Sequence, residues 1–191
     1  MKSFAAATVL IATSALALPT ANTNQRRSTD PASVISNIAQ WTGDIFQVNA
    51  FLDKSQALLN SPPVTFDFVA AATTALGEAG CSEGCAADEP VRLGNLMGLT
   101  TADDTGATNA AADLQNIFPG VIGNLTAIIQ SDNDLDTVQN AISAIVVLRC
   151  NSVLPDIQEL WTNVLQDNGL PSFLGVVSGS GVCPTIEAAT L

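Results

Sequence analysis

The 191-residue chain contains no histidine and no tyrosine, and only six of its residues are lysine or arginine. Without histidine, neither a Ser-His-Asp triad nor a Cys-His pair can form, and no metal site can use imidazole ligands. The chain carries 18 aspartate and glutamate residues and a formal net charge of −12. A surface of this sign repels nucleic-acid phosphates and anionic membranes. We therefore expect no catalytic residues, no metal, no cofactor and no nucleic-acid partner.

Long apolar runs are also scarce beyond the N-terminal leader. Runs such as residues 144–148 are only a few residues long, whereas a membrane-spanning helix needs about 20 apolar residues. We therefore expect no membrane span.

The N-terminus has the pattern of a secretory signal peptide. Lys2 precedes an apolar stretch over residues 4–16, and Ala15-Leu16-Ala17 forms a small-x-small cleavage site. The polar segment that follows carries an isolated dibasic pair, Arg26-Arg27, which is typical of trimming by a dibasic-specific protease. We predict a signal peptide over residues 1–17 with cleavage after Ala17 and a propeptide over residues 18–27 with processing after Arg27. The secreted chain would enter the extracellular space or a cell wall.

Four cysteines remain in a chain that is addressed to an oxidising compartment. They are Cys81, Cys85, Cys150 and Cys183. A zinc site would need four thiolates, which do not persist there, so we predict two disulfides. A Cys81–Cys85 bond would constrain the unfolded chain little, whereas bonds from these two to the distant pair would close long loops. The sequence therefore favours long-range pairing, with the partners left open.

Helical periodicity dominates the rest of the chain. Apolar residues from Val34 to Leu59 recur at spacings of 4-3-4-3-4-7, which predicts a helix over residues 31–60 that ends before Pro62-Pro63. The other predicted helices are residues 65–78, 88–97, 114–128 (kinked or broken at Pro119-Gly120), 135–148 and 155–166. We predict an all-α fold, a single disulfide-stapled bundle of five to seven helices. It would occupy residues 28–170, followed by a Gly/Ser-rich segment, 171–191, tied by Cys183.

Few polar motifs suggest chemistry. The acid pairs Asp88-Glu89 and Asp103-Asp104 would serve a hydrolase that uses carboxylates, but adjacent acids at helix starts are commonly solvated. The stretch 132–136 (DNDLD) resembles the start of a calcium loop, yet it lacks the required glycine and glutamate, so we interpret it as helix capping. Asn124 begins the chain's N-glycosylation sequon, Asn-Leu-Thr.

Aromatic side chains are candidates for contact with an apolar ligand. The candidates are Trp41, Phe46, Phe51, Phe118 and Trp161. Trp41 lies on the stripe of the first helix, and Phe46 and Phe51 flank the stripe on opposite sides. Such residues either pack in a core or line a groove or surface patch. Periodicity does not separate these two roles.

A secretory leader, then DPASVISNIAQWTGDIFQVNAFLDK (residues 30–54), then a succession of Ala/Leu/Val amphipathic helices resembles fungal hydrophobic surface-binding protein A and its cell-wall galactomannoprotein relatives. The resemblance covers about residues 30–166. It implies a secreted, non-catalytic helical protein that coats hydrophobic surfaces, sits in the cell wall or holds lipids. The four cysteines and scarce lysines depart from the family pattern, and no individual functional residue carries over. We therefore expect a non-enzymatic protein that binds lipids or hydrophobic surfaces, with a secreted effector that binds a host protein as the alternative.

Overall fold

The computed structural model describes most of the chain, and the described part is helical. The described residues are 30–61, 66–78, 81, 84–100, 104–175, 177, 179 and 181–183. The predicted signal peptide and propeptide, with the cleavage positions Ala17 and Arg27, lie outside these residues. No β-strand occurs among the described residues, which confirms the predicted all-α class for this part of the chain.

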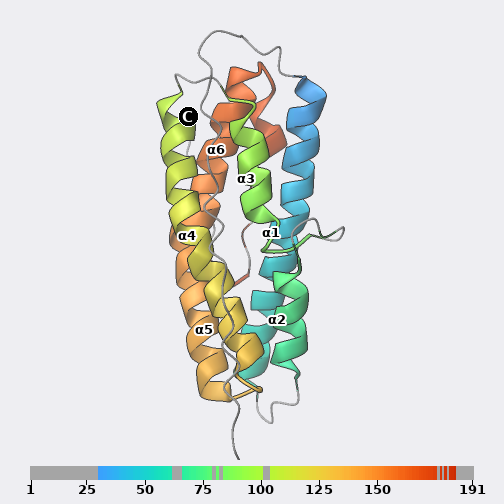
Figure 1. The fold of residues 1–191 in the computed structure, drawn as a ribbon, viewed down its shortest axis with the longest axis vertical. Helices are drawn as coiled ribbons and strands as arrows, with labels where there is room; N and C mark the ends of the chain where they lie inside the picture. The colour runs from blue at the N-terminus through green and yellow to red at the C-terminus, as the bar shows by residue number, and fades with distance from the viewer. Residues whose placement is uncertain are drawn as a thin grey trace, which may run out of the picture.

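Within the described ranges, six α-helices form the bundle in Figure 1. They are α1 (Pro31–Leu59), α2 (Phe68–Leu76), α3 (Glu89–Met97), α4 (Thr105–Gln130), α5 (Leu135–Leu148) and α6 (Leu154–Asp167). A π-helical turn, Arg149–Val153, joins α5 to α6 without a break, so one helix continues over Leu135–Asp167. The described chain therefore contains five separate α-helices, the lower end of the predicted range. A short 3-10 turn, Ser172–Gly175, follows α6.

Four columns of helix make up the bundle (Figure 1). The helix α1, the helix α4 and the continuous α5–α6 helix each run along most of its length, and the shorter α2 and α3 follow one another along the fourth column. The helix α4 packs against α2, α5 and α6, while α1 packs against α2 and α3. The apolar stripe of α1 faces the core. Its buried residues are Val34, Ile38, Trp41, Ile45, Val48 and Leu52.

Aspartate residues are the N-caps of four of the described helices. The capping residues are Asp30, Asp67, Asp104 and Asp134. Each accepts a hydrogen bond from a backbone N–H of the first turn, at donor–acceptor distances of 3.0 to 3.1 Å. Such a cap satisfies an N–H group that has no partner within the helix and contributes about 1 kcal/mol. The acidic stretch 132–136 thus forms the turn and cap between α4 and α5.

The helix α4 is longer than the sequence pattern predicts. The pattern places it over residues 114–128 with a kink or break at Pro119, whereas α4 begins at Thr105 and continues through Pro119 to Gln130. Buried alanines at positions 107, 110 and 111 extend its inward face. Alanine contributes little to an apolar periodicity, so the first two turns gave a weak signal. Packing on the neighbouring helices α2, α3, α5 and α6 compensates for the hydrogen bond that a proline removes.

The continuous helix Leu135–Asp167 is long and apolar enough to be a candidate membrane span by length and composition. This is weak evidence, because the core helix of a soluble bundle meets the same criteria. Here its inward residues pack against α4, and Arg149 lies fully buried near its middle. The absence of a membrane span stays a prediction.

The structure contains two disulfides, but it corrects the predicted pairing. Cys81 bonds to Cys85 and Cys150 bonds to Cys183, at sequence separations of 4 and 33. The prediction weighed only the entropy of the unfolded chain, whereas proximity in the folded chain decides the pairing. The Cα atoms of Cys81 and Cys85 lie 6.3 Å apart, and those of Cys150, in the π turn, and Cys183 lie 5.3 Å apart. In the chain-entropy model the short bond contributes about 2 kcal/mol and the long one about 4 kcal/mol.

Candidate functional site

The predicted aromatic contacts divide into a buried set and one exposed residue. The buried ones are Trp41, Phe51, Phe118 and Trp161, which are at most 6% exposed. The Trp41 ring lies 6.3 Å from the Phe118 ring and 5.9 Å from the Trp161 ring, the latter in an edge-on arrangement. The Trp41 ring therefore packs against both of the other rings within the core. Phe46, in contrast, is 70% exposed.

The exposed side of α1 carries no charge between Pro31 and Leu52. Between Pro31 and Leu52 the only charged residue is Asp44, which is buried. We call the outward residues Ile35, Ala39, Thr42, Phe46 and Ala50 the outer face of α1. They recur at spacings of 4-3-4-4, which keeps them along one side of the helix. In a chain with a net charge of −12, this is an uncharged strip with a large aromatic side chain in it.

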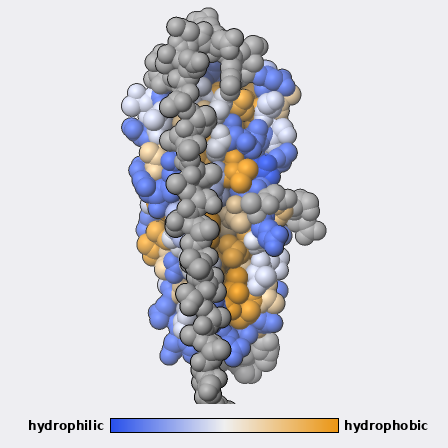
Figure 2. Space-filling model, in the orientation of Figure 1, coloured by the Kyte–Doolittle hydropathy of each residue, from blue (hydrophilic) through white to orange (hydrophobic). Residues whose placement is uncertain are grey.

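Other exposed apolar side chains are scattered. Val91 lies on α3, and Leu135 and Val147 lie at opposite ends of α5. On the face drawn in Figure 2, hydrophobic residues appear in separate patches among hydrophilic ones. Single exposed apolar residues are normal on soluble proteins, so the outer face of α1 is the stronger candidate for a binding surface.

A second feature is a cluster of buried charges between α1, α3 and the π turn. Asp44, Asp88 and Glu89 are each 1% exposed, and Arg149 is fully buried. Arg92 forms ion pairs with Asp44, at 3.4 Å, and with Asp88. Arg149 Nη1 donates to Glu89 Oε1 at 2.8 Å.

The pairing of these buried charges corrects the sequence interpretation of Asp88-Glu89 as a solvated helix start. Sequence spacing does not bring together residues that lie 60 positions apart, as Glu89 and Arg149 do. A signal was nevertheless present, because Arg149 is a lone cation that directly follows the apolar run 144–148. Such a residue needs an acidic partner if the helix is buried.

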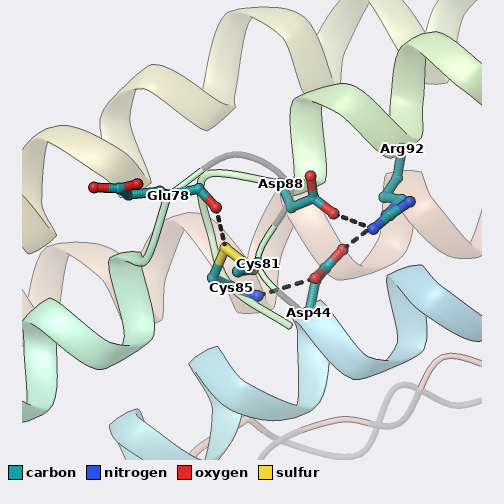
Figure 3. The surroundings of a disulfide bond; sticks show 6 residues. All are labelled: Asp44, Glu78, Cys81, Cys85, Asp88 and Arg92. Carbon is teal, nitrogen blue, oxygen red and sulfur yellow. Dashed lines mark hydrogen bonds and ion pairs between the residues drawn. A yellow bond between two sulfur atoms is a disulfide. The ribbon is translucent and has the colours of Figure 1, made fainter. Parts of the chain in front are cut away.

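The loop that follows α2 is anchored to α1 beside this cluster (Figure 3). The Cys85 backbone N–H donates to Asp44 Oδ1 at 2.9 Å. The next two N–H groups, of Ala86 and Ala87, donate to carbonyl oxygens at the end of α2, at 2.8 and 3.0 Å. Gly84 adopts a φ of 88°, and a Cβ there would lie 2.5 Å from the Gly43 carbonyl oxygen. Only glycine therefore allows the loop to lie this close to α1.

Two carboxyl groups have raised pKa values. Burial raises the pKa of Asp44 to about 6, with the Asp88 charge adding to the rise and the Cys85 amide and Arg92 opposing it. Burial and the nearby charges of Asp113 and Glu159 raise the pKa of Asp156 to about 6. Both carboxyls therefore bind a proton more tightly in the folded chain than in the unfolded chain.

We expect the protein to be more stable at pH 5 than at pH 7. The folded pKa of Asp44 and of Asp156 exceeds the ordinary value of 3.8. Their stabilising contribution is therefore complete below about pH 4 and is lost as the pH rises through about 6. The caps Asp67 and Asp134 have lowered pKa values because of the hydrogen bonds that they accept. Their contribution is lost only as the pH falls below about 4.

Thermal unfolding followed by circular dichroism at pH 3, 5 and 7 tests this expectation. The Tm should be highest at pH 5, and Asp44→Asn should reduce the fall in Tm between pH 5 and pH 7. A Tm that rises from pH 5 to pH 7 would show that these carboxyls are not protonated preferentially in the folded chain.

The cluster also brings together three groups with metal-ligating atoms. Oxygens of Asp44 and Asp88 and the sulfur of Cys81 all lie within 4.8 Å of one another. The sulfur is bonded to Cys85 and is therefore no thiolate, and Arg92 already pairs with both carboxylates. These residues fit a metal ion poorly in this state.

The predicted glycosylation position lies within α4. The side chain of Asn124 is half-buried and donates to the Gly120 carbonyl oxygen at 2.8 Å, while Thr126 Oγ1 donates to the Ile122 carbonyl oxygen at 2.8 Å. Both polar groups of the sequon are thus engaged by their own helix. Modification of Asn124 stays a prediction.

Comparisons of the chain with protein-family models, with curated proteins and with solved structures found no match. The resemblance to the hydrophobic surface-binding family therefore stays a hypothesis based on helix pattern and composition.

Proposed function

We propose that this protein is a secreted, non-enzymatic protein that binds hydrophobic surfaces through the outer face of α1. The observation that carries the proposal is the 70% exposure of Phe46 on a helix side that presents no charge between Pro31 and Leu52. Burying a phenylalanine side chain contributes about 1.5–3 kcal/mol. An uncharged strip can approach an apolar surface without removing water from an ion.

The packing of the core favours an external apolar surface over a lipid held inside the bundle. Four of the five aromatic side chains considered for ligand contact are buried. The Trp41 ring also packs against the rings of Phe118 and Trp161, so a lipid at this position would have to displace them. A flat or extended apolar partner, such as a waxy wall surface or a lipid layer, requires no such rearrangement.

The proposed location is outside the cell, in or near a fungal cell wall. The two disulfides are consistent with an extracellular location. The leader pattern of residues 1–17 supports secretion, and the resemblance to cell-wall galactomannoproteins supports the wall. The strongly acidic remainder of the surface keeps the protein soluble until it meets an apolar phase.

Replacing Phe46 with aspartate should weaken adsorption to a hydrophobic surface. The change removes the largest exposed apolar side chain of the face and introduces a charge that loses water at the interface. We expect the half-saturating protein concentration on polystyrene beads to rise about 5- to 30-fold, as a loss of about 1–2 kcal/mol implies. The Tm should change little, because the side chain is mostly exposed.

Val147→Asp is the matched control, because Val147 is 57% exposed on α5 and has exposed polar neighbours such as Ser143. It should adsorb as the wild type does. Equal losses in the two variants would indicate a general charge effect. If neither variant loses adsorption, the outer face of α1 is not the adsorbing surface. That result would favour the alternative, an effector that binds a host protein.

A further inference from the structure

The two sulfurs of the Cys81–Cys85 disulfide lie in different environments. Cys85 is fully buried, whereas Cys81 is only half-buried. Of the two residues, Cys81 is therefore the more open to an external thiolate. The Cys85 sulfur lies 3.2 Å from the Glu78 carbonyl oxygen (Figure 3), so a thiol at Cys85 has a hydrogen-bond acceptor already in position.

The loop that carries this disulfide is held in place by contacts other than the bond. Three backbone hydrogen bonds, from the N–H groups of residues 85, 86 and 87, hold the loop on α1 and α2. The bond spans only four positions and constrains the unfolded chain weakly. Cys150–Cys183, in contrast, ties the C-terminal segment to the π turn over 33 positions. Opening the short bond should therefore leave the helices in place.

Two acidic side chains lie near the sulfur of Cys81. Asp44 and Asp88 each place a carboxylate oxygen within 4.8 Å of Cys81 Sγ. Arg92 pairs with both, so the three groups together carry one negative charge when ionised. Burial raises the pKa of Asp44 to about 6, which allows this carboxyl to hold a proton near the sulfur in mildly acidic solution.

We propose that Cys81–Cys85 is an exchange site for external thiols, in which the incoming sulfur bonds to Cys81 and Cys85 is the leaving group. With a dithiol, one substrate thiolate attacks Cys81 Sγ, the protein disulfide breaks, and Cys85 takes the electron pair and a proton. The second substrate thiolate then attacks the substrate sulfur of the mixed disulfide, and Cys81 leaves and is protonated. The dithiol loses two electrons and two protons, and the protein gains them.

The charge around Cys81 determines the class of thiol. The local negative charge and the net charge of −12 disfavour anionic thiols at low ionic strength. Cationic and neutral thiols, such as an aminothiol, are therefore the preferred substrates. The exchange proposal and the surface-binding proposal rest on different residues, so they can fail independently.

The first experiment treats the folded wild-type protein with dithiothreitol, blocks free thiols with an alkylating reagent and locates them by peptide mass spectrometry. We expect Cys81 and Cys85 to be alkylated at dithiothreitol concentrations at least tenfold below those that expose Cys150 and Cys183. The helical circular dichroism should be unchanged at that point. Simultaneous opening of both disulfides, or loss of helix on opening the first, would overturn the proposal.

Single-cysteine variants test which sulfur is attacked. In Cys85→Ser the free Cys81 should form a mixed disulfide with oxidised cysteamine, whereas in Cys81→Ser the buried Cys85 should react at least tenfold more slowly. Comparable reaction of the two variants, with native circular dichroism, would contradict attack at Cys81.

Charge selectivity provides a readout that needs no cysteine variant. The rates at which cationic cysteamine and anionic glutathione open the wild-type disulfide are compared as a ratio. The ratio of the cysteamine rate to the glutathione rate should be about 3- to 10-fold larger at low salt than at 1 M salt. Asp44→Asn should reduce this salt-dependent ratio, and Asp113→Asn, at an exposed position on α4, should not. A ratio independent of both salt and Asp44 would show that the acidic cluster does not select the thiol.

Discussion

Replacing Arg149 with methionine is expected to lower the free energy of unfolding by about 3–5 kcal/mol. Arg149 is fully buried and donates to Glu89 Oε1 at 2.8 Å and, through Nε, to Asn49 Oδ1 at 3.3 Å. Methionine fills much of the same volume, so the loss comes mainly from the Glu89 carboxylate, which is left buried without a cation. Urea unfolding followed by circular dichroism measures the change.

The double variant Arg149→Met/Glu89→Met tests this explanation. Removing both charges removes the cost of a buried unpaired carboxylate, so we expect the double variant to recover most of the stability lost by the single one. A double-mutant cycle should give a coupling of more than about 2 kcal/mol. If the losses of the two single variants simply add, the two side chains do not act as a pair.

The second large effect concerns two phenylalanines on α1 that both flank its apolar stripe in the sequence pattern. Phe51 is 6% exposed and Phe46 is 70% exposed. Phe51→Ala should cost about 3–5 kcal/mol, because it leaves a cavity in the core. Phe46→Ala should change stability by at most about 0.5 kcal/mol, because no packed neighbour is lost.

Thermal and urea unfolding measure the stability of both alanine variants, and the adsorption assay measures their binding to a hydrophobic surface. Phe46→Ala should weaken adsorption without lowering the Tm, and Phe51→Ala should lower the Tm without a specific effect on adsorption. A large loss of stability in Phe46→Ala would mean that its ring packs against the protein and is not presented to a partner.

The inward face of the first helix could be predicted because its spacing is regular and its residues are large. Val34, Ile38 and Trp41 repeat at helical intervals, and all three are buried. The same pattern could not tell which flanking phenylalanine faces solvent, because that depends on where α2 and α3 pack. The early start of α4 was missed because its inward residues there are alanines, whose small side chains give little periodic signal.

The candidate sites depend on contacts between distant parts of the chain. The Asp44–Arg92 and Glu89–Arg149 pairs join residues 48 and 60 positions apart, and no local rule relates them. The predicted disulfide pairing was wrong for a related reason. Loop-closure entropy in the unfolded chain favours long connections, but in the folded chain Cys81 lies beside Cys85, with Cα atoms 6.3 Å apart.

The π turn has a consequence for the spacing of the long helix. Buried side chains recur every four residues through Ile145, Arg149, Val153, Ile157 and Trp161, whereas an α-helix returns to the same side every 3.6 residues. The wider π turn at Arg149–Val153 takes up part of that mismatch. Deleting a single residue there, such as the exposed Asn151, would rotate all of α6 by about 100° relative to α5. Trp161 would then turn away from Trp41, so a change in the length of this short turn would disrupt the packing of the whole of α6.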